Sequence, residues 1–492
     1  MQRILPPVMQ LRSVFLAIGI MTVLLGMAMI PCALIDMADG RQETYVFEVS
    51  AFGSILIGSC IWVLSRGEVE RSGQREGFLL TVLVWVFLPM IAAIPFLALG
   101  MSFTDAMFES ISGLTTTGAT VLTGLDDMPR GILLWRAILQ WIGGIGIIVT
   151  AIAILPQLRV GGMQLFELES SDISGKFLPR ITDIAAYLGL TYLLISVLCA
   201  FLYYLTGMSW FDAIAHAMTT MSAGGYSTHD ASFGYFNDTN APYVATFFMF
   251  VAGLPFSLLA MLMLQGRIRP MLSDPQPRLY VCLALAFSTI IVVYHEAVVD
   301  PPVFDHIFHG FKEALFNIIS IMTGTGYASA PYDTWGQPVM VVFLGATFVG
   351  GCAGSAACGL KMFRLEIAAK TILAYSQKMI QPHRRTPVRY AGKTVDEEVL
   401  QSVMVFVSLY LLTFLVAAAL ISLTGVDALT AISGAATSVS NVGPGLGPMI
   451  GPSGTFQLLP DFAKWVCAIA MLLGRLEFVA VFVVLTRRFW RG

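Results

Sequence analysis

Charged residues are scarce in this chain. Asp, Glu, Lys and Arg make up only 12% of its 492 residues, whereas 57% are hydrophobic, and the mean hydropathy is +0.77. A water-soluble protein of this length would carry far more charge. Apolar runs long enough to cross a bilayer recur along the whole chain. The composition therefore predicts a polytopic membrane protein without a sizeable soluble domain, and it argues against catalysis outside the membrane.

Patterns for metal binding and redox chemistry are also missing. The seven cysteines lie in apolar or glycine-rich segments without a CxxC or a cysteine–histidine spacing, and the six histidines form no ligand pattern. We interpret the cysteines as small packing residues. The predicted spans hold no pair of catalytic acids and no nucleophile beside a base, so we do not expect an intramembrane enzyme.

Ten membrane spans are predicted from the apolar runs. Their approximate bounds are 14–36, 46–65, 78–100, 132–156, 182–206, 243–265, 279–298, 339–375 (broken), 398–424 and 461–486. The first run is too long for a cleaved signal peptide and lacks a small-residue cleavage site. Of the 28 lysines and arginines, 22 fall on one side of this arrangement, eight of them between Lys361 and Lys393. By the positive-inside rule, this side and both termini are cytoplasmic.

Four stretches of sixteen residues align without a gap, and each ends in glycine. They are 103–118, 210–225, 311–326 and 428–443. Each contains a hydroxyl residue three and six positions before its glycine. A twelve-residue helix spans only about 18 Å and cannot cross a bilayer, so each stretch predicts a re-entrant helix that ends in a glycine loop. The loop residues are Thr115, Thr116, Thr117 and Gly118; Ser222, Ala223, Gly224 and Gly225; Thr323, Gly324, Thr325 and Gly326; and Ser440, Asn441, Val442 and Gly443.

Four such loops inside a membrane predict a cation filter. Non-helical backbone at membrane depth is tolerated only around protein or an aqueous cavity. Converging main-chain carbonyls can replace the water around a dehydrated cation, and the negative C-terminal ends of the short helices favour the same charge. We expect Asp105, Asp212 and Glu313 to cap three of these helices, with Asp427 near the fourth. Glycines that only pack helices are the alternative, which four copies in register disfavour.

The predicted fold is therefore all-α, with four pseudo-symmetric helix–pore loop–helix units around a central pore and an N-terminal two-helix hairpin. The hairpin covers residues 1–77, and the units cover 78–179, 180–277, 278–395 and 396–492. Glycines at about 345–360 oppose a regular helix in unit three. Arg475 falls inside a predicted span and so needs a partner elsewhere or an aqueous cavity, and a structural ion pair is one role that would meet this need.

The four loops, together with the segments 140–146, 350–355 and 471–477, resemble the Trk/Ktr/HKT superfamily of K⁺ transporters, and the N-terminal hairpin is similar to its TrkH branch. The resemblance covers nearly the whole chain. It implies K⁺ uptake with K⁺ bound in the filter, a homodimer in the bacterial inner membrane, and a cytoplasmic nucleotide-binding regulatory subunit of the TrkA type. It also implies that Gly350, Gly351 and Gly354 form a gate and that Arg475 is an electrostatic barrier. Membrane lipid is a further expected partner, and nucleic acid is not expected.

A Na⁺- or H⁺-coupled secondary symporter is the competing hypothesis. Such proteins often combine inverted repeats with a polar solute site at mid-membrane. Here all four units run in the same direction, and no polar cluster of solute size stands out. In plant relatives, serine in place of the first filter glycine accompanies Na⁺ transport, so Gly118 favours K⁺. Whether transport is passive or coupled to protons stays open.

Overall fold

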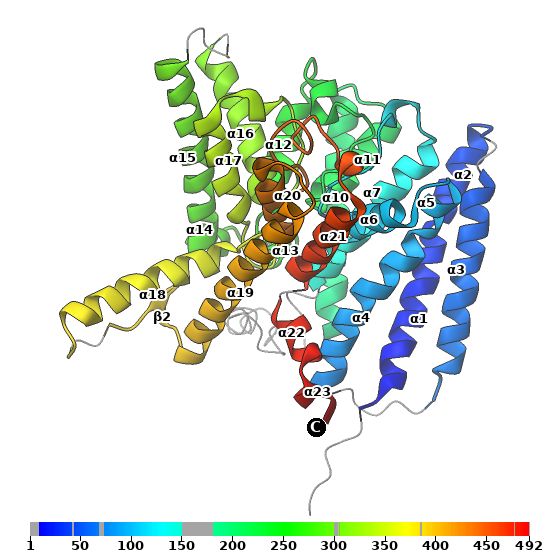
Figure 1. Cartoon of the computed structure of the whole chain (residues 1–492), viewed down its shortest axis with the longest axis horizontal. Helices are drawn as coiled ribbons and strands as arrows, with labels where there is room; N and C mark the ends of the chain where they lie inside the picture. The colour runs from blue at the N-terminus through cyan, green and yellow to red at the C-terminus, as the bar shows by residue number, and fades with distance from the viewer. Residues whose placement is uncertain are drawn as a thin grey trace, which may run out of the picture.

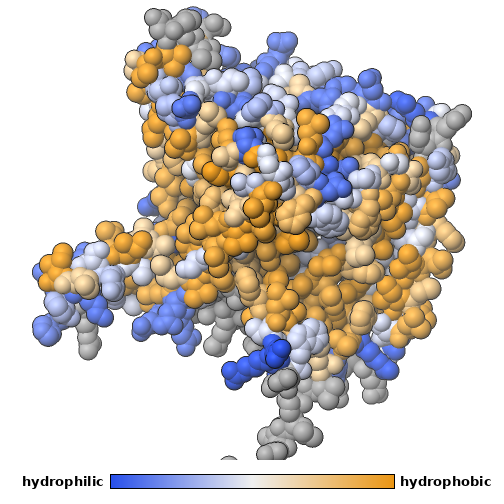
Figure 2. Space-filling view, viewed as in Figure 1, coloured by the Kyte–Doolittle hydropathy of each residue, from blue (hydrophilic) through white to orange (hydrophobic). Residues whose placement is uncertain are grey.

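The computed structural model describes residues 9–41, 44–67, 73–149, 181–299, 304, 306–383, 386–476 and 478–491. These residues form helices, connecting loops and one two-stranded hairpin. Figure 2 shows an apolar belt around the middle of the visible face, with hydrophilic residues gathered above and below it. The described residues contain seven helices that are long and apolar enough to cross a membrane, or eight if one bent pair is counted. The predicted all-α polytopic membrane fold is confirmed.

The helices divide between the hairpin and the four units (Figure 1). The hairpin contains α1 (Leu11–Ala28), α2 (Ile30–Ala38) and α3 (Thr44–Leu64). Unit one contains α4 (Gln74–Ala92), α5 (Ile94–Ala98), α6 (Phe103–Leu114) and α7 (Arg130–Val149). Unit two contains α10 (Ile181–Leu205), α11 (Trp210–Met221), α12 (Ala241–Ala252), α13 (Phe256–Gln265) and α14 (Arg269–Ser273).

Units three and four follow the same plan. Unit three contains α15 (Pro275–Val298), α16 (Ile307–Thr323), α17 (Gln337–Phe348), α18 (Met362–Ile380) and the antiparallel strands β1 (Arg389–Tyr390) and β2 (Lys393–Thr394). Unit four contains α19 (Glu397–Ser422), α20 (Ala428–Ser440), α21 (Asp461–Arg475), α22 (Val479–Leu485) and α23 (Arg487–Arg491). A short 3-10 helix follows each glycine loop: η1 (Leu125–Asp127), η3 (Ser232–Phe236), η4 (Tyr332–Thr334) and η5 (Phe456–Leu458).

Two predicted unit boundaries fall inside helices. α4 begins at Gln74 and α15 at Pro275, ahead of the boundaries at 78 and 278. α15 begins early because the Asp274 carboxylate accepts a hydrogen bond of 2.8 Å from the backbone N–H of Gln276, with proline at the first helical position. The boundary at 179/180 lies outside the described residues.

Three predicted spans are broken. The span 243–265 is bent by 105° between α12 and α13, and the span 339–375 is divided between α17 and α18, as its glycines predict. The prediction of one continuous span over 461–486 is wrong, because α21 ends at Arg475 and Phe478 has a φ of +38°. A left-handed phenylalanine cannot continue a right-handed helix. Arg475 therefore ends a helix instead of lying within one.

The N-terminal hairpin is joined by small residues. An ideal Cβ on Gly19 would lie 2.7 Å from the backbone nitrogen of Trp62, and one on Gly58 would lie 2.7 Å from that of Val23. Glycine at these positions lets the backbones of α1 and α3 approach closely. α1 contacts α4, and α2 contacts α7, so the hairpin lies on the outer side of unit one (Figure 1).

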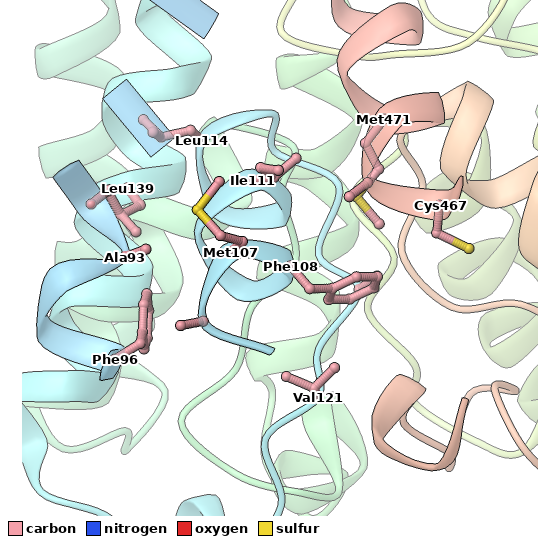
Figure 3. Close-up of a cluster of buried hydrophobic side chains, with 14 of the residues drawn as sticks. Ala93, Phe96, Met107, Phe108, Ile111, Leu114, Val121, Leu139, Cys467 and Met471 are labelled. Carbon is pink, nitrogen blue, oxygen red and sulfur yellow. The ribbon is translucent and has the colours of Figure 1, made fainter. Parts of the chain in front are cut away.

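The four units pack in a closed order. The second half of each unit contacts the short helix of the next: α7 contacts α11, α12 contacts α16, α17 contacts α20, and α21 contacts α6. Figure 3 shows this packing around α6, where Phe108 lies between Val121 and the side chains of Cys467 and Met471 on α21. Each short helix is thus held by apolar contacts with two units, which keeps its C-terminal end near the centre of the molecule.

Candidate functional site

The four glycine loops lie against one another in chain order. An ideal Cβ on each final glycine would collide with, or closely contact, the carbonyl oxygen of the residue that precedes the next loop's final glycine. The distances are 2.1 Å for Gly118 and Gly224, 1.6 Å for Gly225 and Thr325, 2.1 Å for Gly326 and Val442, and 2.8 Å for Gly443 and Thr117. The fourth loop thus returns to the first, and the four loops form a closed ring. Only glycine fits at these contacts.

The four loops also share one backbone path. The residue two positions before each final glycine and the glycine itself both have positive φ. The values are 53° and 83° for Thr116 and Gly118, 52° and 75° for Ala223 and Gly225, 76° and 77° for Gly324 and Gly326, and 52° and 107° for Asn441 and Gly443. Non-glycine residues rarely adopt this conformation, so the surrounding structure must hold Thr116 and Ala223 in it.

A cavity of about 260 Å³ opens onto the ring. Its lining includes the final glycine of every loop, together with Arg136 and His229. The four loops therefore face one shared space. Among the residues that the structure describes, no group of three His, Cys, Asp or Glu side chains could hold a metal ion. The loops themselves offer a cation their backbone carbonyl oxygens and the side-chain oxygens of their hydroxyl residues and of Asn441.

The hydroxyls three positions before the glycines are bound within the protein. The Thr115 hydroxyl donates to the carbonyl oxygen of Ile111 at 2.7 Å, and the Thr323 hydroxyl donates to that of Ile319 at 2.8 Å. Each also lies within hydrogen-bonding distance of the hydroxyl two residues later in the chain, that of Thr117 at 2.8 Å and that of Thr325 at 2.7 Å. These hydroxyls fix the ends of α6 and α16.

The prediction that acids cap the short helices is wrong in position. The Ser102 hydroxyl accepts a hydrogen bond of 3.1 Å from the backbone N–H of Asp105, and Ser209 and Asp212 repeat this contact at 3.1 Å. The serine is therefore the N-cap. The aspartate, in the first turn, accepts a hydrogen bond from the serine hydroxyl through its carboxylate. In unit four, Asp427 is the N-cap.

Glu313 differs because α16 is longer than predicted. The helix begins at Ile307, so Glu313 lies inside it and is buried. Its carboxylate accepts a hydrogen bond from the Ser329 hydroxyl, in the segment that leaves the third glycine loop. Glu313 thus holds a loop instead of capping a helix.

A column of polar residues that sequence reasoning missed ties each loop to its own helix. It lies nine positions before the final glycine in units one to three and ten before it in unit four. Each side chain bonds the segment just after the loop. The contacts are Glu109 Oε2 with the backbone N–H of Val121 at 3.0 Å, His216 Nε2 with Ser227 Oγ at 3.0 Å, Asn317 Oδ1 with the backbone N–H of Ser329 at 3.2 Å, and Ser433 Oγ with the backbone N–H of Leu446 at 3.0 Å. Each lies three or four positions before the hydroxyl that the four stretches share, and this helical spacing was the signal that could have revealed them.

Arg136 links units one and two beside the ring. Its Nε donates to Glu109 Oε1 at 2.8 Å, with both side chains almost fully buried. Nη1 donates to the carbonyl oxygen of Ser227 at 3.0 Å, and the guanidinium lies 4.0 Å from the ring centre of Tyr226. A buried cation is retained only with such partners. Arg136 thus joins α6, α7 and the second glycine loop.

The glycine-rich segment of unit three forms a buried loop between Val349 and Lys361. The predicted segment begins too early, because α17 continues to Phe348. The backbone N–H groups of Cys352 and Ala356 donate to the carbonyl oxygens of Gly253 and Ala252, at 2.9 and 3.2 Å. The loop is therefore fixed at the bend between α12 and α13. These bonds satisfy backbone groups that water cannot reach.

The same loop reaches the base of the ring. The backbone N–H of Cys358 donates to the carbonyl oxygen of Thr323 at 3.1 Å. Gly350 and Gly351 allow close approach, since ideal Cβ atoms would lie 2.0 Å from the Cys358 carbonyl oxygen and 2.5 Å from the Cβ of Ala357. Gly354 has a φ of +69°. The predicted residues Gly350, Gly351 and Gly354 therefore all belong to this buried loop, which contacts the third glycine loop through Cys358.

Arg475 binds this loop. Nη1 donates to Cys358 Sγ at 2.9 Å, and Nη2 donates to the carbonyl oxygen of Gly143 at 3.2 Å. The side chain is buried, and its Nε has no hydrogen-bond partner. Both partners are uncharged groups, a thiol and a backbone carbonyl. Among the described residues, Arg475 forms no salt bridge with a carboxylate. It places a positive charge between the loop and α7. Glu477 lies outside the described residues.

His229 lines the outer cavity and contacts two aspartates. His229 Nδ1 lies 2.5 Å from Asp126 Oδ1, and Nε2 lies 3.6 Å from Asp212 Oδ1. Its ring stacks on Tyr235 at 3.6 Å between ring centres. Burial disfavours the imidazolium, but the two carboxylates outweigh burial and raise the pKa of His229. Although burial opposes it, the contact with His229 lowers the pKa of Asp126.

Comparisons with known proteins agree with this architecture. The family model "TrkH: Cation transport protein" matches residues 45–490. The chain is 39% identical over 462 residues to the Trk system potassium uptake protein TrkI of Halomonas elongata, covering 93% of this chain and 92% of that protein. It is 35% identical to the Trk system potassium uptake protein TrkH of Escherichia coli, covering 98% of this chain and 100% of that protein.

A solved structure gives the same result. The crystal structure of the potassium transporter TrkH from Vibrio parahaemolyticus matches with a TM-score of 0.89 and 33% identity, covering 98% of this chain and 100% of that one. These relatives are named as transporters, which agrees with the prediction that the chain is not an enzyme. The match extends over almost the entire length of each protein, so this chain belongs to the TrkH family of cation transport proteins.

Proposed function

We propose that this protein is the membrane subunit of a Trk-type system and takes up K⁺ through the ring of glycine loops. The observation that carries the proposal is the closed contact of each final glycine with the carbonyl of the next loop. Backbone oxygens that converge from four sides can replace the hydration shell of an alkali cation. The C-terminal ends of the four short helices add partial negative charge there. The relatives' names give the ion as potassium.

The gate, in this proposal, is the buried loop between Val349 and Lys361. Its contacts with Thr323 and with Arg475 support a position on the inner side of the ring. The Arg475 guanidinium would repel a cation leaving the ring, because a charge with no carboxylate partner keeps its field at low dielectric. Transport then requires both the loop and Arg475 to move away from the ion path.

Cation flux in proteoliposomes tests the proposal. Purified protein should pass K⁺ and Rb⁺ more readily than Na⁺ and Li⁺, and Gly118→Ser should erode that preference. Conversion of Gly443 to serine should have the same effect from the opposite side of the ring. If both variants fold and keep the wild-type order of ions, the glycines only pack the loops together, and the filter assignment is wrong.

We also propose a homodimer in the bacterial inner membrane with both termini in the cytoplasm, where a nucleotide-binding regulatory subunit docks. The exposed cations Lys378 and Lys393 support the docking site, because α18 and the β-hairpin extend from the bundle on the side where α23 lies (Figure 1). Replacing both lysines with glutamate should abolish co-purification with that subunit and leave the dimer intact by mass photometry. Unchanged co-purification would exclude this surface as the docking site.

A further inference from the structure

Gln140 of α7 binds the second glycine loop with both ends of its side-chain amide. Nε2 donates to the carbonyl oxygen of Gly224 at 2.7 Å, and Oε1 accepts a hydrogen bond of 3.0 Å from the backbone N–H of Tyr226. The orientation of the amide is decided by chemistry, because a backbone N–H can only donate. Gln140 is fully buried, so water does not compete for either contact. A residue of unit one therefore fixes the peptide groups on both sides of Gly225.

This contact explains a glycine that conformation does not require. Gly224 is absent from the residues with positive φ, so its backbone is open to any side chain. An ideal Cβ there would, however, lie 2.4 Å from Cδ of Gln140. The other three loops carry side chains at this position, namely Thr117, Thr325 and Val442. The second loop has glycine because Gln140 occupies the space of the missing side chain.

The bound oxygen is one of the four carbonyl oxygens that lie against the final glycine of the preceding loop in the ring. Among the described residues, no side chain donates a hydrogen bond to the carbonyl oxygens of Thr117, Thr325 or Val442, so the ring is chemically unequal. A carbonyl oxygen has two lone pairs, and that of Gly224 has already committed one. The hydrogen bond also fixes its position. A fixed oxygen resists contraction of the ring around a cation smaller than K⁺.

We infer that Gln140 is a positioning residue that determines ion specificity, because it holds the Gly224 carbonyl at the distance that suits K⁺ and not Na⁺. The inference rests on the proposed role of the four loops as a K⁺ filter. It adds to that role a residue outside the loops, on a transmembrane helix of the neighbouring unit.

The test compares K⁺ and Na⁺ flux through the full-length protein in proteoliposomes. Gln140→Leu removes both hydrogen bonds, and Gln140→Glu keeps the acceptor for Tyr226 but cannot donate to Gly224. Both should lower the K⁺-to-Na⁺ permeability ratio, by about three- to tenfold if one hydrogen bond is lost. Trp141→Phe is the matched control on the same helix, because among the described residues its side chain donates one hydrogen bond, of 3.1 Å from Nε1 to Ser196, and none to a glycine loop. It should keep the wild-type ratio.

Unchanged ratios in folded Gln140→Leu and Gln140→Glu would overturn the inference. If these variants do not fold, the pair Gln140→Ala with Gly224→Ala decides the matter, since each change makes room for the other. That double variant should fold where Gly224→Ala alone fails, and its ratio should be low. A wild-type ratio, or failure to fold, counts against the inference. A wild-type protein without K⁺ preference would instead refute the proposed function itself.

Discussion

At the scale of single residues, glycine acts in two different ways in this protein. Gly100 and Gly118 have similar φ values of 86° and 83°. An added Cβ would find nothing within 4 Å at Gly100, but it would lie 2.1 Å from a carbonyl oxygen at Gly118. Alanine at Gly100 would therefore cause only the backbone strain of a left-handed conformation. Alanine at Gly118 would cause the same strain and would also push the neighbouring loop away.

We expect Gly100→Ala to lower the free energy of unfolding by roughly 1–2 kcal/mol, because of its conformation alone, and to leave ion selectivity unchanged. Gly118→Ala should suffer the same strain and also lose K⁺-over-Na⁺ selectivity, since its methyl group must displace the Gly224 carbonyl. Thermal unfolding and flux measurements on both variants check this. Loss of selectivity in both, or in neither, would contradict the role assigned to close approach.

His229 predicts a pH-dependent stability of the outer cavity. Its raised pKa stabilises the folded protein at pH values below the ordinary 6.5, and this contribution is lost as the pH rises through the raised value. The lowered pKa of Asp126 stabilises the folded protein at pH values above the ordinary 3.8. This stabilisation is lost as the pH falls through the lowered value. Between these limits the ion pair is intact.

His229→Gln should therefore lower the Tm most at about pH 5–6, and the difference from wild type should shrink toward pH 9. Differential scanning fluorimetry of purified protein across this range measures it. Asp230, which also lines the cavity, is the control position, because its carboxylate accepts only backbone N–H groups, those of Gly124 and Leu125. A pH-independent difference for His229→Gln would show that stacking on Tyr235 matters more than charge.

At the scale of elements, the segment after α17 shows why some helices must stop. Gly345 lies within α17 in open space, whereas an added Cβ at Gly350 would lie 2.0 Å from the Cys358 carbonyl oxygen. The first glycine is tolerated in a helix, and the second makes the buried loop possible. Both residues are glycine, so their different roles come from the backbone that surrounds each of them.

We expect Gly345→Ala to raise stability by up to about 1 kcal/mol, because alanine is the better helix former. Gly350→Ala should displace the loop, increase basal Rb⁺ flux several-fold and expose Cys358 to small thiol reagents. Flux assays and mass spectrometry of the modified peptide measure both effects. Wild-type flux and an unreactive Cys358 in Gly350→Ala would argue that the loop does not obstruct the ion path.

At the scale of the whole molecule, the distribution of positive charge predicts orientation. Lys393 in the β-hairpin and Asp238 after η3 are both exposed. By the positive-inside rule the first faces the cytoplasm and the second the opposite side. In intact cells, a membrane-impermeant maleimide should label Asp238→Cys, and it should label Lys393→Cys only after permeabilisation. The wild-type chain, with its own seven cysteines, gives the background. The reverse pattern would invert the proposed topology.

The sequence by itself determined the fold class, the four-fold repeat and the loops that carry it. Hydropathy is a local property that can be read from a single chain. The glycines recur at the same position in each repeat because each loop needs a residue without a side chain there. It could not place the N-caps at Ser102 and Ser209, since serine and aspartate three residues apart compete for that position. The break after Arg475 was equally hidden, because apolar runs at 467–473 and 478–485 flank it and read as one span.

Only the tertiary structure decided which loops meet and what holds them. Gln140 lies 84 residues from Gly224, and Arg475 lies 117 residues from Cys358. Contacts over such distances leave no periodic signal in one chain. They arise because each unit packs its second half against the next unit's short helix, so the partners of a loop belong to another part of the sequence. Local chemistry fixed the parts, and packing between units fixed the ring.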